Sequence, residues 1–286
     1  HAAPGPGIPR GRKATLWTGS PVPALPRRER AEAVTRLGLA DDRRTLLLMG
    51  GSQGAADLNA LLPALCAELA RSDEAWQVLN LTGPAAVGCP ELDADGRCQG
   101  VPVTRLPFCD DMPSAWAVSD VAVCRSGAGT VAELALAGTP SVLVPYPHHA
   151  DQHQVANALP LVEAGAAALV GAHDPTGARS VPSLLHQLLA RRERMAAAAR
   201  RMARPEAAIR VADAVEALAR GPEVFATWLS ALPAGARVPR DAQGGEAALP
   251  REPVLREPRA APPSADDPQG SAVRPDCETS GAGRPS

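Results

Sequence analysis

Residues 45–55, TLLLMGGSQGA, join a short apolar run directly to a glycine-rich turn. The apolar run has the length and composition of a buried strand, and the sequence that follows predicts a helix from about Ala56. The three glycines of the turn allow positive φ and close approach to a ligand. N–H groups at the start of a helix attract anions. This unit therefore predicts an α/β fold with a phosphate-binding turn.

The turn matches neither of two common nucleotide fingerprints. It is not G-x-G-x-x-G, and it lacks the lysine of G-x-x-x-x-G-K-[ST]. Ser52 and Gln53 nevertheless place side-chain donors beside Gly54, where a diphosphate would need them. The alternative is structural, because glycines also permit a tight turn with close packing of a helix on a strand.

Apolar periodicity predicts alternating strands and helices through the middle of the chain. The predicted strands are a short one near Thr15 and then 45–49, 76–81, 102–106, 120–124, 141–145 and 167–170; the predicted helices are 29–37, 56–70, 111–117, 128–137, 151–164 and two or three more to about 219. Such alternation indicates parallel βαβ units with right-handed crossovers. The predicted fold class is α/β, a Rossmann-like doubly wound parallel sheet over residues 15–220.

The two ends differ from this middle in composition. Residues 1–14 and 221–286 are rich in Pro, Gly, Ala and Arg, with few large apolar side chains. We expect residues 1–14 to be disordered or a linker remnant, and residues 221–286 to be a disordered tail. The alternative for Val224 to Leu229 is a short amphipathic piece docked on the core.

Three more polar segments follow predicted strands. FCDDM at 108–112 follows VTRL, RSGAGT at 125–130 follows DVAVC, and PYPHHADQHQVAN at 145–157 follows SVLV. Ligands of open parallel α/β sheets bind at the carboxyl ends of the strands. We therefore expect these segments and the glycine-rich turn to meet in one crevice.

In this order, GGSQGA, FCDDM, CRSGAGTVAE and PYPHHADQHQVANA resemble the C-terminal, donor-binding half of the MurG family of peptidoglycan glycosyltransferases (glycosyltransferase family 28). The resemblance covers about residues 18–218. It implies an inverting transferase of GT-B type that moves N-acetylglucosamine from UDP-GlcNAc to undecaprenyl-pyrophosphoryl-MurNAc-pentapeptide (lipid I), forming lipid II. It implies no cofactor and no metal, and a bacterial protein peripheral to the cytoplasmic face of the cell membrane.

The resemblance also implies roles for individual residues. Ser52 would contact the donor, the backbone at Cys109 would read uracil, and Glu133 would accept the ribose hydroxyls. Gln154 and Asn157, with His153 beside them, would bind the sugar hydroxyls. The expected donor site comprises Ser52, Gln53, Gly54, Phe108, Cys109, Met112, Arg125, Ser126, Gly127, Ala128, Gly129, Thr130, Glu133, His153, Gln154 and Asn157.

Several of these residues have a second interpretation. Phe108 suits stacking on a flat base, or it packs in the core. Asp110 and Asp111 favour the N-cap and first turn of a helix over catalysis. Arg125 either neutralises phosphate or pins its loop, and Glu133 is alternatively an exposed helix residue.

A metal site is the weaker interpretation of the last segment. His149 and His153 have i, i+4 spacing with Asp151 between them, a pattern compatible with zinc on a helix. Pro145 and Pro147 instead favour an extended loop before the helix. We therefore predict no metal here.

The chain also departs from the family it resembles. Ser20 and Pro23 stand in the stretch where family members usually carry an Asn and an Arg, which removes an expected diphosphate contact. We expect no counterpart of the family's N-terminal acceptor domain in these residues, and we identify no catalytic residue among them. The expected alternatives are a donor-binding subunit of a split UDP-GlcNAc transferase, or a degenerate non-catalytic module.

Composition and charge restrict the classes of partner and the environment that we expect for this chain. The formal net charge of −2 does not indicate a nucleic-acid partner. Six cysteines without a C-x-x-C pair predict reduced thiols, as in a cytosolic protein, and no apolar run reaches the length of a membrane span. The arginines between 191 and 204 form a basic helix, which either faces anionic lipid or is simply solvated.

Overall fold

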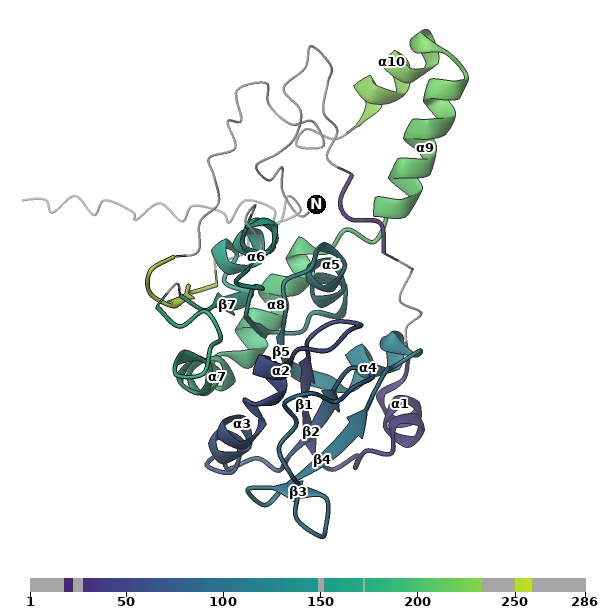
Figure 1. The fold of residues 1–286 in the computed structure, drawn as a ribbon. Helices are drawn as coiled ribbons and strands as arrows, with labels where there is room; N and C mark the ends of the chain where they lie inside the picture. Colours follow the sequence, from purple (N-terminus) through teal and green to yellow (C-terminus); the bar gives the residue numbers. More distant parts are fainter. Residues whose placement is uncertain (1–17, 23–27, 149–151, 172, 233–249, 259–286) are drawn as a thin grey trace, which may run out of the picture.

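A computed structural model describes residues 18–22, 28–148, 152–171, 173–232 and 250–258 (Figure 1). Its sheet has eight strands in the order β3-β4-β2-β1-β5-β6-β7-β8. The strands are β1 (Arg44–Met49), β2 (Trp76–Leu81), β3 (Arg97–Cys98), β4 (Val101–Leu106), β5 (Ser119–Cys124), β6 (Ser141–Leu143), β7 (Ala167–Leu169) and β8 (Val254–Leu255). The six central strands are parallel, and the two edge strands, β3 and β8, are antiparallel to their neighbours. The predicted doubly wound parallel sheet is confirmed.

Helices cover both faces of this sheet (Figure 1). They are α1 (Arg30–Leu37), α2 (Ala56–Asn59), α3 (Leu62–Leu69), α4 (Met112–Val118), α5 (Ala128–Ala137), α6 (His153–Glu163), α7 (Ser180–Leu189), α8 (Arg192–Met202), α9 (Ala207–Ala219) and α10 (Pro222–Ala231). Successive side chains of β1 point to opposite faces of the sheet and so belong to two separate core layers. Leu47 and Met49 pack with α1, α4, α5 and α6, whereas Leu46 and Leu48 pack with α2, α3 and α7.

The chain changes direction across the sheet between β1 and β5. From β1 it adds β2 and β4 on one side, and from β5 it adds β6 and β7 on the other. This is the topological switch point of a doubly wound sheet, where ligands bind beside the carboxyl ends of the strands. The glycine-rich turn follows β1 and the RSGAGT segment follows β5, so both lie at the switch point.

One predicted helix is broken in two. The sequence predicts a helix over 56–70, but α2 ends at Asn59 and α3 begins at Leu62. Pro63 lies in the first turn of α3 and has no N–H to donate to the carbonyl of Asn59. The helix therefore cannot continue, and α2 is a single short turn.

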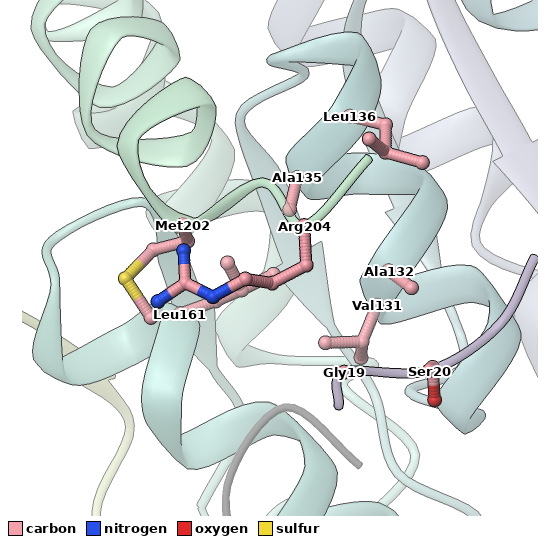
Figure 2. A pocket seen from close by; sticks show the side chains of 9 residues that line it. All are labelled: Gly19, Ser20, Val131, Ala132, Ala135, Leu136, Leu161, Met202 and Arg204. Atoms are coloured by element: carbon pink, nitrogen blue, oxygen red, sulfur yellow. The ribbon is translucent and has the colours of Figure 1, made fainter. Parts of the chain in front are cut away.

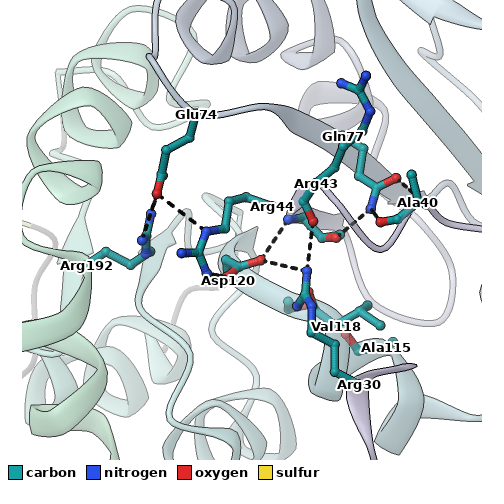
Figure 3. Close-up of polar contacts among 12 residues, drawn as sticks. Arg30, Ala40, Arg43, Arg44, Glu74, Gln77, Ala115, Val118, Asp120 and Arg192 are labelled. Carbon is teal, nitrogen blue, oxygen red and sulfur yellow. Dashed lines mark hydrogen bonds and ion pairs between the residues drawn. The ribbon is translucent and has the colours of Figure 1, made fainter. Parts of the chain in front are cut away.

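Opposite the switch point, a polar network joins the amino-terminal ends of β1 and β5 (Figure 3). The register of this strand pair shifts between Thr45 and Leu46, and the Asp120 carboxylate accepts from the Thr45 N–H at 2.9 Å. Arg44 and Arg30 pair with the same carboxylate at 2.9 and 3.3 Å. Asp120 thus restores at the bulge a hydrogen bond that the ladder lacks.

The ends of the chain differ from the expected disorder in two described segments. Residues 222–231 form helix α10, which packs on α9 and buries no residue completely. Residues 254–255 form β8 on the edge of β7. These two segments have regular structure: Phe225 and Trp228 stack on one face of α10, and β8 completes backbone hydrogen bonds of β7. Residues 15–17 lie outside the described residues, and 18–22 contain no strand.

Asp111 is the N-cap of α4. Its carboxylate accepts from the Ser114 N–H at 3.2 Å and from the Ser114 hydroxyl at 2.7 Å, and these bonds hold the pKa of Asp111 below its usual value. Asp110 precedes the cap and is exposed, so it does not lie in the first turn. The predicted capping role is therefore confirmed for Asp111.

We expect Asp111→Ala to lower the free energy of unfolding by about 1 kcal/mol, because it removes the cap. Asp111→Ser should retain most of the stability, and Asp110→Ala should change it little. Because the folded pKa is lowered, the contribution is present above the unfolded pKa and is lost as pH falls through the folded one. Urea unfolding at neutral and acidic pH measures both effects; equal losses for the two Ala variants would contradict the assignment.

Candidate functional site

The glycine-rich turn after β1 serves packing at two of its three glycines. A Cβ on Gly54 would lie 2.2 Å from the Thr82 carbonyl oxygen, and one on Gly50 would lie 2.4 Å from the Ala55 Cβ. Gly51 has a φ of +91° and open space around it. Ser52 and Gln53 are exposed at the tip of the turn. The structural interpretation therefore accounts for Gly50 and Gly54, while Ser52 and Gln53 remain accessible to a ligand.

The helix start after this turn is a weak anion site. We expected a long helix from Ala56, but α2 has four residues, so its aligned peptide dipoles are few. Gly88 packs against Ala56, where an added Cβ would lie 2.3 Å from the Ala56 carbonyl oxygen. The predicted contribution of this helix start to diphosphate binding is correspondingly reduced.

The start of α5 has the geometry of an anion site. Gly127 is the N-cap of this ten-residue helix, with Ala128, Gly129 and Thr130 in its first turn. A Cβ on Gly129 would meet nothing within 4 Å, and one on Gly127 only the Thr130 hydroxyl at 3.9 Å. The first turn has no acidic residue. Its N–H groups lack partners within the helix and are not covered by side chains at the glycines.

Arg125 pins the loops at the switch point. Its buried guanidinium contacts both Asp57 carboxylate oxygens at 2.7 Å and donates to the carbonyls of Val144 and Pro145 at 3.1 and 3.2 Å. It also lies over the ring of Tyr146, 5.4 Å from the centroid. Of the two alternatives for Arg125, the geometry favours pinning the loop over neutralising phosphate.

Ser126, Gln154 and Asn157 join the loop after β5 to the start of α6. The Ser126 hydroxyl donates to the Gln154 carbonyl at 2.8 Å, and the Asn157 amide donates to the Ser126 carbonyl at 3.2 Å. The Gln154 side-chain oxygen accepts from the Tyr146 N–H at 2.9 Å. Asn157 is buried. The structure thus brings Ser126 together with Gln154 and Asn157, the two predicted sugar-binding amides, but it also uses the polar groups of all three to hold the loops.

Glu133 lies half-buried in the second turn of α5. One carboxylate oxygen, Oε2, accepts from the Trp116 indole N–H at 3.1 Å. Burial raises the pKa of Glu133 above its usual value, and the Trp116 hydrogen bond opposes that shift. The alternative of an exposed helix residue is wrong; the carboxylate is held in a fixed orientation near the open start of α5.

The segment after β4 presents an aromatic ring to solvent. Phe108 is 57% exposed, so the core-packing alternative for this residue is wrong. Cys109 is buried beside it, and burial raises the pKa of its thiol. Met112 begins α4 and packs against the core. An exposed ring next to a strand-end backbone is the arrangement that a flat base needs for stacking.

The zinc interpretation gains no support from the described part of the chain. Helix α6 begins at His153, and His149 and Asp151 lie outside the described residues. Within those residues, no group of three or more His, Cys, Asp or Glu side chains could hold a metal ion. No helix among them is long and apolar enough to cross a membrane.

A pocket that is open to solvent lies along the flank of α5 rather than at its start (Figure 2). It is lined by Gly19, Ser20, Val131, Ala132, Ala135, Leu136, Leu161, Met202 and Arg204. Most of these side chains are apolar, which does not suit a diphosphate. Ser20, one of the departures from the family pattern, lies in its wall; Pro23 lies outside the described residues.

Sequence reasoning missed two residues that shape the site. Asp57, the partner of Arg125, follows the glycine-rich turn as an acidic residue in the first turn of α2. Trp116, the partner of Glu133, is one of four tryptophans in the chain. An acid directly after a phosphate-type turn is a signal that was available, because it would repel a phosphate unless a cation neutralised it.

The chain matches the model of the glycosyltransferase family 28 C-terminal domain over residues 45–217. It is 39% identical over 206 residues to a UDP-N-acetylglucosamine–N-acetylmuramyl-(pentapeptide) pyrophosphoryl-undecaprenol N-acetylglucosamine transferase of Burkholderia thailandensis, covering 71% of this chain and 55% of that protein. A relative of the same name from Burkholderia mallei has the same identity and coverage. The chain therefore spans about half the length of these relatives.

A solved structure agrees with the sequence relatives. The crystal structure of Acinetobacter baumannii MurG aligns with a TM-score of 0.51 and 32% identity, covering 68% of this chain and 54% of that one. The part that aligns has the fold of a GT-B glycosyltransferase. The comparison confirms the fold class predicted from the four segments.

We expect Arg125→Met to lower the free energy of unfolding by about 3 kcal/mol, because Asp57 and two carbonyls would lose their donor. The Asp57 side chain is 27% exposed, so solvent weakens this pair relative to a fully buried one. Asp57→Asn combined with Arg125→Met should be less destabilised than the two single effects added. Arg220→Met, which removes the exposed ion pair with Glu216, is the matched control. Additive losses in denaturant unfolding would show that the pair is not coupled.

Proposed function

This chain belongs to glycosyltransferase family 28, and we propose that its fold binds the UDP-GlcNAc donor for transfer of N-acetylglucosamine to a lipid-linked acceptor. The observation that carries the proposal is the uncovered start of α5 at the switch point of the sheet. The relatives that this chain matches over about half of their length are named as N-acetylglucosamine transferases acting on a pyrophosphoryl-undecaprenol acceptor.

The diphosphate fits the start of α5. The N–H groups of Ala128, Gly129 and Thr130 would donate to its oxygens, with the helix dipole favouring the negative charge. Ser52 and Gln53, exposed across the switch point, add donors. These groups would stabilise the charge that develops on the UDP leaving group, and that charge is larger in the transition state than in the bound donor.

The nucleoside and the sugar of the donor would lie on the two sides of the diphosphate. Glu133, oriented by Trp116, would accept the two ribose hydroxyls, and Phe108 would stack on the uracil. Gln154 and Asn157 would reach the sugar hydroxyls with the hydrogen-bonding capacity that the loop contacts leave. The pinned loops supply the rigidity that such positioning needs, because Arg125, just after β5, holds α2 and the segment after β6 together.

The acceptor belongs to another part of the enzyme in this proposal. The chain spans 55% of its relatives, and no described residue is placed as a general base for the acceptor hydroxyl. We infer direct displacement by that hydroxyl once an acceptor-binding domain, in the same protein or in a separate subunit, covers the donor. The lipid-linked acceptor would place the complex at the surface of the cytoplasmic membrane.

We expect UDP-GlcNAc to bind the chain more tightly than UDP-glucose or GDP-mannose in calorimetric titration. Glu133→Gln should weaken UDP-GlcNAc binding about 10- to 100-fold, since bonds to a charged acceptor contribute about 1.5–3 kcal/mol. The same variant should not destabilise the fold at neutral pH. Burial raises the folded pKa of Glu133, so its ionised form costs stability there, and acidification relieves that cost.

A matched titration with UDP separates the nucleotide from the sugar. Equal affinities of the unaltered chain and of Glu133→Gln for UDP-GlcNAc, with both chains folded, would contradict the ribose role. Failure of the folded chain to bind UDP or any of the nucleotide sugars would contradict the donor-binding proposal itself.

Gly129→Ala separates packing from binding at the start of α5. The added methyl meets no atom within 4 Å, and Ala is the better helix former, so the free energy of unfolding should rise by about 0.5–1 kcal/mol. The methyl would lie where the diphosphate must approach, so we expect donor affinity to fall by about tenfold, or 1.4 kcal/mol. Thermal unfolding and titration on the same preparation test both; a more stable chain with unchanged affinity would exclude this helix start.

A further inference from the structure

The edge of β7 receives a strand from the distant tail of the chain. In Figure 1 this is the yellow segment beside β7. Leu255 pairs antiparallel with Ala168 and Val254 with Leu169, and the two side chains pack against opposite core layers. The strand is only two residues long. We call residues 250–258 the strap.

Two glycines flank β7 and make room for the strap. A Cβ on Gly165 would lie 2.4 Å from Pro258 Cα, and one on Gly171 would lie 2.5 Å from the Arg251 carbonyl oxygen. The His173 N–H donates to the same carbonyl at 3.3 Å. We call the edge of β7 between these two glycines the seat. The seat fits an extended backbone at both ends, and a side chain at either glycine would collide with that backbone.

Charge fixes one end of the strap. Glu257 contacts Arg191 at 2.9 Å and Arg194 at 3.1 Å, with one carboxylate oxygen on each guanidinium. All three side chains are partly exposed, so these contacts are weakened by salt and by competing charge. At the other end Glu252 reaches His173 only at 4.0 Å. The strap is thus held by a short backbone pairing, by the packing of Val254 and Leu255 on the core, and by one main electrostatic anchor.

The strap also ends the growth of the sheet. Without it, β7 would present unpaired N–H and C=O groups, which readily pair with a strand of another chain. The strap's own outer edge is a poor template, because Pro253 and Pro258 flank the paired residues and have no N–H to donate. When the strap is absent, the edge of β7 can therefore accept one strand. When the strap is in place, its outer edge does not readily accept another.

We propose that the β7 edge is a strand-acceptor site, filled by residues 250–258 of the same chain, and that it accepts this segment from a second copy when the Glu257 anchor is weakened. Residues 233–249 can span up to about 55 Å when extended, so covalent geometry allows the strap to reach a neighbouring copy. The exchanged strap would make the same contacts with the second copy as it makes within its own chain.

Charge-reversed full-length chains test this proposal. Variant one is Glu257→Arg, and variant two is Arg191→Glu with Arg194→Glu. Each variant alone has a strap that its own seat repels, so the backbone amides of residues 167–169 should exchange with deuterium about tenfold faster than in the unaltered chain. In a 1:1 mixture, each strap matches the seat of the other chain. We expect a heterodimer by light scattering, with exchange at 167–169 returned to the unaltered rate.

Two controls isolate the anchor. Glu252→Arg changes the same charge in the same segment away from Arg191 and Arg194, and it should leave exchange at 167–169 unchanged. The triple variant, with all three reversals in one chain, should regain slow exchange within a single chain. Unaltered exchange in both charge variants, or a mixture that stays unassociated with fast exchange, would overturn the proposal.

Discussion

The pairing of β1 with β5 organises the rest of this structure, because the chain changes direction there and the candidate site lies at its carboxyl end. Charged groups hold the pair at both ends. Asp120 takes the Thr45 N–H at the amino-terminal end, and Arg125 joins Asp57 to the end of β6 at the other. Apolar side chains along β1 fill both core layers but do not distinguish one strand end from the other. The polar contacts at the two ends fix that geometry.

The candidate site divides its polar groups between structure and binding. Neighbouring segments are held by hydrogen bonds from the side chains of Arg125, Ser126 and Asn157. The start of α5 and the tip of the glycine-rich turn instead face open space. Rigid loops around uncovered N–H groups are the arrangement that electrostatic stabilisation of a leaving group requires, since donors fixed in advance need no reorganisation during reaction. Glu133 fits the same pattern, with Trp116 fixing its orientation.

The sheet treats its two edges alike. Each edge strand has two residues and runs antiparallel to its neighbour, and these short strands limit the exposed backbone of an otherwise parallel sheet. At the β3 edge a local turn supplies the covering strand, since β3 immediately precedes β4. At the β7 edge the covering strand comes from the far tail, so that protection depends on contacts such as Glu257 with Arg191.

The sequence by itself determined the α/β class, the order of the six parallel strands along the chain and the strand-end segments, because period, glycine position and capping act locally. It located the start of α5 at Ala128 and the cap at Asp111. Tertiary structure alone decided that Phe108 is exposed, that Arg125 is committed to Asp57, that α2 is a single turn and that residues 254–255 join the sheet. These outcomes depend on residues distant in the chain, or on competition between packing and propensity, and neither leaves a periodic signal in the sequence.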